Sequence, residues 1–115
     1  MPDETLVRDL LQLSELLRKY GHYGQADVVQ QILISVETAN PDYKRLAGIE
    51  MWGGAGAVWE VGLTPNRTSS EGRTDEKSFR EAIIRTAASM DRLGIGTERS
   101  RSIARTFQGW LQQGL

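Results

Sequence analysis

Apolar residues recur at helical spacing in four long stretches of this 115-residue chain, and glycine, proline or polar residues separate the stretches. The first stretch covers residues 6–20, where leucines recur every three or four residues along one face of an amphipathic helix. Its apolar positions are Leu6, Leu10, Leu13, Leu17 and Tyr20, widened by Val7, Leu11 and Leu16. Gly21 is expected to end this helix, because glycine readily adopts the left-handed conformation found at helix C-termini.

The second stretch predicts a helix over residues 25–39, joined to the first by the four-residue turn 21–24. Its apolar face comprises Val29, Ile32, Val36 and Ala39, with Val28 and Leu33 beside it. Two helices joined by so short a turn are expected to lie antiparallel as a helical hairpin.

Glycine and tryptophan mark the middle of the chain. Asn40 and Pro41 are typical of a helix start, which predicts a short helix over residues 42–47. Residues 52–59 then combine two tryptophans with three glycines. Because glycines disfavour a long helix and tryptophans favour burial, we expect a buried or half-buried turn, followed by a helical turn over residues 58–61.

Two further amphipathic stretches follow a polar segment, residues 63–73, that is expected to be a loop. Thr74 is expected to cap a third long helix that ends at Gly94, and Thr97 a last helix over residues 98–113. The third helix has an apolar face of Phe79, Ile83, Ala87 and Met90, and the last has Ile103, Phe107, Trp110 and Leu111. The sequence therefore predicts an all-α fold: one domain, a compact bundle of four principal helices, with one short helix and an irregular glycine- and tryptophan-rich centre.

Composition narrows the classes of function. The chain contains no cysteine, which excludes disulfides, thiolate nucleophiles and cysteine-bound metal clusters. Its start is acidic and its apolar runs are short, so we expect a cytoplasmic protein that does not enter a membrane. Residues 1–40 carry an excess of three acidic groups, and residues 73–115 an excess of three basic groups. The simplest interpretation is that these charges pair within the fold.

No residues form a recognisable catalytic or metal-binding group. His22 is the only histidine, and spacing places no partner for catalysis or metal binding beside it. We interpret it as a polar turn residue. Glu50 and Glu60 flank the glycine-rich turn, but nothing in the sequence fixes the separation that paired catalytic carboxylates need. We therefore predict a protein that is not an enzyme and uses no metal or cofactor.

Gly53, Gly54 and Gly56 invite comparison with phosphate-binding loops. A Walker loop continues with lysine and then serine or threonine, which are missing here. Trp59 stands where a dinucleotide-binding fingerprint has its third glycine. We favour the interpretation that the glycines let the chain pass close to Trp52 and Trp59, with an anion-binding turn as the alternative.

The last helix offers two further surfaces. Arg99, Arg101 and Arg105 form a basic face of the kind that contacts nucleic-acid phosphates. Because Glu98 adjoins this face and no other basic cluster supports it, we favour a solvated or internally paired face, with nucleic-acid binding as the alternative. The apolar stripe of the helix either covers the core of its own chain or pairs with a second copy in a homodimer, and the sequence leaves both open.

The central segment, residues 53–61, resembles part of a family of small bacterial helical proteins that carry a domain of unknown function. In that family a Gly-Gly-Met-Gly-Ser-type turn follows two amphipathic helices and leads to an Asp-Leu pair. Here Ala55 and Ala57 replace the methionine and the serine, and Glu60 and Val61 stand in place of the pair.

This resemblance covers residues 5–93, and the helix over residues 97–113 is an addition to it. It implies a small accessory protein of bacterial origin. Some members of the family are similar to immunity proteins that neutralise bacterial toxins. The resemblance supplies no catalytic residues.

Together these observations favour a non-catalytic domain that binds another protein, with inhibition of a bacterial toxin as the specific form of the hypothesis. Binding hot spots are enriched in tryptophan, tyrosine and arginine. The candidate contact region therefore comprises Tyr43, Trp52, Trp59 and the segment 63–73. The alternative is a small-molecule or anion site at the glycine turn, lined by Trp52, Trp59 and His22.

Overall fold

The computed structural model describes residues 3–63 and 69–114, and every regular element in this part of the chain is helical. The elements are α1 Glu4–Lys19, α2 Tyr23–Val36, α3 Ile49–Trp52, the 3-10 turn η1 Val58–Glu60, α4 Ser70–Arg92 and α5 Glu98–Gln112. The predicted all-α class is confirmed, and so is the helical turn near residue 58.

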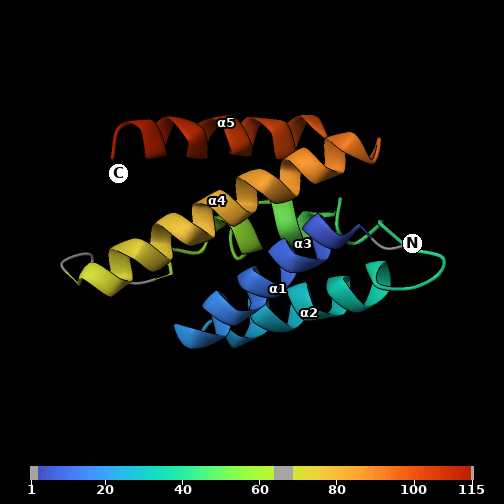
Figure 1. The fold of residues 1–115 in the computed structure, drawn as a ribbon, viewed down its shortest axis with the longest axis horizontal. Helices are drawn as coiled ribbons and strands as arrows, with labels where there is room; N and C mark the ends of the chain where they lie inside the picture. Colours follow the sequence, from blue (N-terminus) through green and yellow to red (C-terminus); the bar gives the residue numbers. More distant parts are fainter. Residues whose placement is uncertain (1–2, 64–68, 115) are drawn as a thin grey trace.

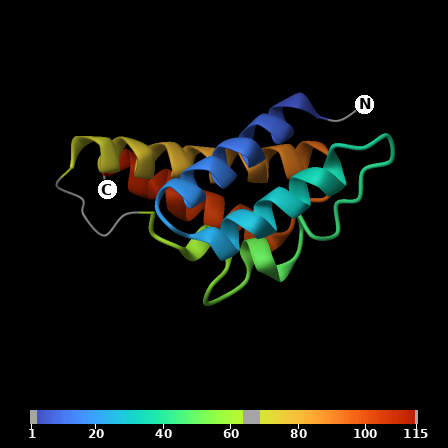
Figure 2. The same ribbon diagram turned by 90° about the horizontal axis from the view of Figure 1, so that it is seen from below.

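The four long helices contact one another in the order α2, α1, α4, α5 (Figure 1). α1 and α2 form the predicted antiparallel hairpin, and α4 lies between this hairpin and α5. α3 contacts η1 and α5, while Figure 2 shows the segment that contains α3 beside α2. The glycine- and tryptophan-rich segment therefore connects the two ends of the row of helices.

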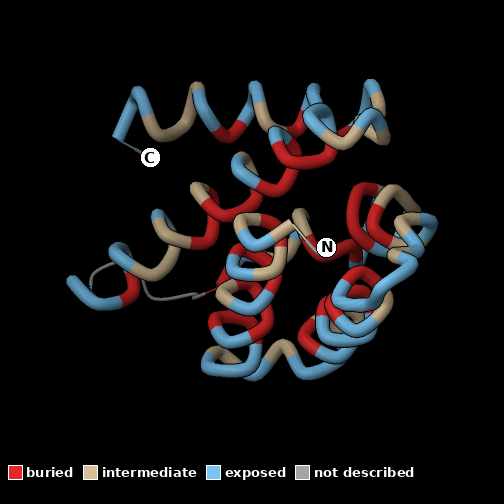
Figure 3. Tube along the Cα trace, turned by 45° about the vertical axis from the view of Figure 1, so that its right-hand side comes forward, coloured by how far each residue is buried: buried red, intermediate tan, exposed pale blue. Residues whose placement is uncertain are grey.

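The predicted apolar faces meet in one core, and the buried side of each long helix faces the others (Figure 3). Buried side chains include Leu6, Leu10, Leu13 and Leu17 of α1, Val29, Ile32 and Val36 of α2, Phe79, Ile83 and Met90 of α4, and Ile103 and Phe107 of α5. Burial of one such side chain contributes about 1.5–3 kcal/mol. This packing holds together helices whose outer faces are polar.

Polar side chains fix where three of the helices begin. Ser69 Oγ accepts a hydrogen bond from the Gly72 amide at 3.1 Å, and Asp3 caps α1 in the same way. Thr97 Oγ1 accepts from the Ser100 amide at 3.0 Å, and Ser100 Oγ accepts from the Thr97 amide at 3.0 Å. These reciprocal bonds form a capping box, which confirms Thr97 as the cap of α5.

The predicted start of the third long helix is wrong. α4 begins at Ser70 rather than after Thr74, because Ser69 supplies the side-chain cap one turn earlier. The predicted loop over residues 63–73 therefore ends inside α4, and its residues 64–68 lie outside the described part of the chain.

The predicted short helix over residues 42–47 is also wrong. Asp42 Oδ1 accepts a hydrogen bond from the Lys44 amide at 3.0 Å, a local bond that competes with helix formation. The residues after Tyr43 form turns, and the short helix begins only after Gly48. α2 ends at Val36, so the predicted helical position Ala39 is exposed and lies beyond the helix.

Candidate functional site

Trp52 and Trp59 each donate an indole hydrogen bond to a backbone carbonyl six residues earlier in the chain. Trp52 is only 2% exposed, and its indole nitrogen donates to the Leu46 carbonyl at 2.8 Å. Trp59 is half-buried, and its indole nitrogen donates to the Gly53 carbonyl. A buried indole needs such an acceptor. The two rings therefore close the glycine turn from inside.

Arg99 of α5 holds the same turn from another direction. Its Nε donates to the Trp52 carbonyl at 2.7 Å, and its Nη2 donates to the Gly53 carbonyl at 3.1 Å. The guanidinium also lies 5.5 Å from the centre of the Trp59 ring, within the range of a cation–π interaction. One carbonyl, that of Gly53, thus receives both the indole of Trp59 and the guanidinium of Arg99.

Much of the backbone of the glycine turn is already hydrogen-bonded within the chain. The Gly56 amide donates to Glu60 Oε2 at 2.8 Å, and the Gly56 carbonyl accepts from Gln25 Nε2 at 3.2 Å. The Ala57 amide donates to the Gly54 carbonyl at 3.0 Å. A bound anion would compete with the carboxylate of Glu60 for the Gly56 amide and would be repelled by its charge. This geometry favours a structural role for the glycines.

His22 and Tyr43 also make contacts within the fold. His22 Nε2 lies 3.2 Å from the Leu63 carbonyl, and the Leu63 amide donates to Glu76 Oε2 at 3.0 Å. His22 therefore connects the start of α2 to the chain that follows η1. Tyr43 is half-buried and packs against the core. Among the described residues, the walls of a hollow bordered by Trp52 and of a groove bordered by Trp59 do not include His22.

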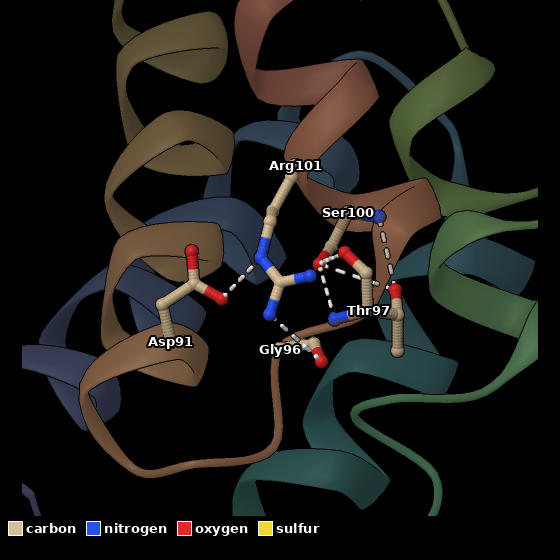
Figure 4. A network of polar contacts seen from close by, with 5 residues as sticks. All are labelled: Asp91, Gly96, Thr97, Ser100 and Arg101. Atoms are coloured by element: carbon tan, nitrogen blue, oxygen red, sulfur yellow. Dashed lines mark hydrogen bonds and ion pairs between the residues drawn. The ribbon is translucent and has the colours of Figure 1, made fainter.

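The three arginines of α5 do not form one basic face. Arg101 Nε donates to Asp91 Oδ1 at 2.9 Å, and its Nη2 approaches the Gly96 carbonyl at 3.4 Å (Figure 4). Arg99 is bound to the glycine turn, and Arg105 lies exposed one turn beyond Arg101. Internal pairing therefore accounts for two of the three guanidinium groups.

Ile103 and Phe107 of the apolar stripe of α5 are buried in the core of their own chain, whereas Trp110 and Leu111 are half-buried. Phe107 is 3% exposed and stacks on Trp110 with ring centres 5.1 Å apart. The Trp59 ring also packs on Phe107, tilted by 54° with ring centres 6.3 Å apart. The guanidinium of buried Arg80 lies 4.9 Å from the Trp110 ring. A groove of about 260 Å³ lies along these rings.

The large apolar side chain exposed next to the glycine turn is an isoleucine. Ile49, the first residue of α3, is 83% exposed, although Met51 and Trp52 of the same short helix are buried. A hollow of about 280 Å³ separates Ile49 from α2, and a hollow of about 300 Å³ separates it from α5. Gly54 and Gly56 are exposed close by. The result is an apolar projection between two depressions, held by the Trp52 and Arg99 contacts.

Among the residues that the structure describes, the other large apolar side chains exposed on the surface belong to the hairpin. Leu11 is 47% exposed, Tyr23 60% and Ile34 63%, and all three lie on α1 or α2. The sequence prediction that Leu11 belongs to the apolar, buried face of α1 is wrong, because the other leucines of α1 already fill the contact with the core. We call Leu11, Tyr23 and Ile34, with the polar side chains between them, the outer hairpin face.

The apolar periodicity of the sequence does not predict this face, but the distribution of charge along α2 could have indicated it. α2 has a single charged residue, Asp27, in fourteen positions. A helix at the edge of a bundle normally keeps charged side chains in the solvent. Depletion of charge on an exposed helix is typical of a contact surface.

Charged pairs tie α4 to α1 at both ends of the hairpin. Lys19 Nζ lies 2.8 Å from Asp75 Oδ2, and the Tyr20 hydroxyl donates to the same oxygen at 2.6 Å. The ammonium and the hydroxyl together lower the pKa of Asp75. In return, hydrogen bonding to Asp75 raises the pKa of Tyr20. At the other end, the guanidinium of Arg92 lowers the pKa of Asp3.

The described residues, 3–63 and 69–114, contain no cluster of three or more histidine, cysteine, aspartate or glutamate residues that could hold a metal ion. No helix in this part of the chain is both long and apolar enough to cross a bilayer.

Comparison with known proteins gives no relative for this chain: no family model, no curated protein and no solved structure matches it.

Proposed function

We propose that this chain is a non-catalytic protein-binding domain whose main contact residue is Ile49. The observation that carries the proposal is the projection of this apolar side chain, 83% exposed, between two depressions of about 280 and 300 Å³. A partner that inserts a side chain into each depression would bury Ile49 completely. Fully buried anchors surrounded by contacts that exclude water dominate binding energies.

The rigidity of the surroundings supports this role. The backbone on both sides of the projection is fixed by the indole of Trp52 and the guanidinium of Arg99. A surface that is already ordered loses little conformational entropy when a partner binds. The tryptophans predicted as contact residues thus contribute indirectly, by holding the exposed isoleucine in place.

Charge indicates the class of partner. The segment 21–63, which carries the projection, contains five acidic and two basic residues. The basic residue Arg45 lies 2.9 Å from Glu50 and is thereby neutralised. A basic protein surface with apolar side chains at its centre would complement this region. The resemblance to immunity-like proteins gives the specific form of the proposal, in which the partner is a bacterial toxin that the chain inhibits.

Affinity capture with two baits tests the proposal. Wild-type protein and Ile49→Asp, both tagged, are used on lysate of the source cells, and bound proteins are quantified by mass spectrometry. The partner, once purified, is titrated against both proteins by calorimetry. We expect Ile49→Asp to weaken binding at least tenfold, because a carboxylate would be buried without a partner.

Ile34→Asp is the matched control, since Ile34 is also exposed but lies on the outer hairpin face. It should retain the partner with unchanged affinity. Circular dichroism of both variants should match the wild type, because neither side chain belongs to the core. A purified partner that binds Ile49→Asp and wild type equally, or a bait that recovers no stoichiometric partner, contradicts the proposal.

A further inference from the structure

The outer hairpin face has an internal symmetry. Its row along α2 consists of Tyr23, Asp27, Gln30 and Ile34, with intervals of four, three and four residues. Read in reverse, the row has the same intervals, with an apolar side chain at each end and a polar one at each inner position. Such a row is self-complementary when two copies meet antiparallel around a two-fold axis, because residue i of one copy then contacts residue j of the other, and residue j contacts residue i.

We infer that this face binds a second copy of the chain, with the two α2 helices antiparallel around a two-fold axis. In this arrangement Tyr23 of each copy packs on Ile34 of the other, and Asp27 of each copy faces Gln30 of the other. Apolar side chains then meet only apolar ones, and no two like charges are brought together along α2.

Leu11 enlarges the apolar ends of the face. Arg18 Nη2 donates to Asp27 Oδ1 at 3.0 Å across the hairpin. Leu11 lies seven residues before Arg18 on α1, and Ile34 lies seven residues after Asp27 on α2. Because the helices are antiparallel and seven residues make two turns, Leu11 and Ile34 lie beside each other. Tyr23 of the second copy can therefore contact both.

The polar centre is also complementary. Arg18 Nη2 donates to Gln30 Oε1 at 3.1 Å as well as to Asp27, so each copy has one neutral ion pair in the middle of the face. Within the described residues, the amide nitrogen of Gln30 and the second oxygen of Asp27 have no hydrogen-bond partner in their own chain. Across the two-fold axis the Gln30 amide can donate to Asp27, and the reverse pair forms at the same time.

The contact is small, since it involves one face of a two-helix hairpin. Interfaces at the low end of the usual size range are weak, which predicts a dissociation constant of about 10–100 μM. Self-association should therefore depend on concentration. It uses a surface separate from Ile49, so it stands or falls independently of the proposed function.

Sedimentation equilibrium of the full chain measures the dimer directly. We expect the mass to rise from 12.8 kDa toward twice that value as the concentration approaches about 500 μM. Ile34→Asp should remain monomeric throughout this range, and Ile49→Asp should dimerise like the wild type. A wild-type chain that stays monomeric, or a dimer that survives Ile34→Asp, overturns the proposal.

Engineered cysteines test the antiparallel register, and the absence of natural cysteines makes every cross-link informative. Eleven residues of helix separate positions 23 and 34 by about 16 Å, too far for a disulfide within one chain. The double variant Tyr23→Cys/Ile34→Cys should form a covalent dimer under mild oxidation. Each single variant should cross-link at least tenfold more slowly. Equal rates for single and double variants exclude the proposed register.

Discussion

α5 and α2 lie at opposite ends of the row of helices, and they use their side chains in opposite ways. α5 has arginines and aromatic rings, the residue types expected at an interface, yet Arg99 binds the glycine turn and Phe107 is buried. α2 has one charged residue, and it leaves Tyr23 and Ile34 in the solvent. α5 has the composition typical of an interface, but its Arg99 and Phe107 make their contacts within the chain.

The difference teaches that hot-spot residue types do not by themselves identify a contact surface. A guanidinium next to an indole contributes the same attraction inside one chain as between two. In this protein the combination of Arg99 and Trp59 fixes a turn. The missing charge on α2 is the more informative pattern, because an exposed helix has little reason to lack charge unless another surface covers it.

The largest expected difference in stability is between the loss of an aromatic side chain of α5 and the loss of an apolar side chain of α2. Phe107→Ala should lower the free energy of unfolding by about 3–5 kcal/mol, because it removes a buried ring and its contacts with Trp59 and Trp110. Ile34→Ala should change it by less than about 0.5 kcal/mol. Urea unfolding at low protein concentration measures both. Similar losses for the two variants would end the comparison.

The next largest loss of stability is expected from a substitution in the glycine turn. A Cβ at position 53 would lie 2.5 Å from the Ile49 carbonyl oxygen and 3.1 Å from the Ile49 Cβ. Gly53→Ala should therefore cost about 1–3 kcal/mol, because the last turn of α3 must shift. Gly54→Ala is the control, since a Cβ there meets nothing within 4 Å and should change stability by less than about 0.5 kcal/mol. Thermal unfolding followed by circular dichroism distinguishes the two, and equal melting temperatures would contradict the crowded position of Gly53.

Two arginines of α5 are expected to differ in their contribution to stability, because Arg99 binds backbone carbonyls and Arg105 is exposed to solvent. Arg99→Ala should cost about 1 kcal/mol, because the Trp52 and Gly53 carbonyls lose a charged donor at a partly solvated site. Arg105→Ala should leave stability within about 0.5 kcal/mol of the wild type. Tryptophan fluorescence adds a specific readout, since only Arg99→Ala should alter the environment of Trp59. A larger loss in Arg105→Ala would reverse the assignment.

The smallest expected effect on stability comes from Asp75, which lies on α4 and not on α2 or α5. The ammonium of Lys19 and the hydroxyl of Tyr20 lower the pKa of Asp75, so the folded state binds this proton less readily than the unfolded state. Stability from Asp75 is therefore present above the unfolded pKa of about 3.9, and is lost as the pH falls through the lowered folded pKa.

Asp75→Asn should flatten the decline of stability in acid, as measured by urea unfolding between about pH 2 and 5. The same substitution in a Lys19→Met background should have a smaller effect, because the main partner of the carboxylate is already gone. An unchanged slope in the single variant would show that the Lys19–Asp75 pair does not couple folding to protonation.

The long helices could be predicted because each has a broad apolar face with helical spacing. Gly21 and Gly94 end α1 and α4 with φ values of 82° and 77°, as their position in the pattern indicates. Helix starts were less predictable where two capping residues compete. Ser69 and Thr74 are both suitable caps, and the choice between them depends on contacts of the first turn, such as that of Lys19 with Glu71.

The exposure of Ile49 could not be predicted from the sequence, because it depends on which apolar side chains the core has room to bury. Ile49 and Trp52 are three residues apart in one helix, a spacing that predicts a shared face, yet one is exposed and the other buried. α3 has only four residues, too few for periodicity to define a face. Leu11 was equally undetermined, since α1 has more leucines than its partner helices can cover.

The carbonyl of Gly53 connects residues that are 46 positions apart in the chain. Through it, α3, η1 and α5 share their hydrogen bonds, so opening any one of them exposes the others. Hydrogen exchange in native conditions would then show the amides of Trp52, Ala57 and Glu60 opening together with those of α5, as one cooperative unit. The amides of α1 and α2 would belong to a second unit, with α4 between them. Local opening of the first unit would remove the Ile49 surface and leave the hairpin folded.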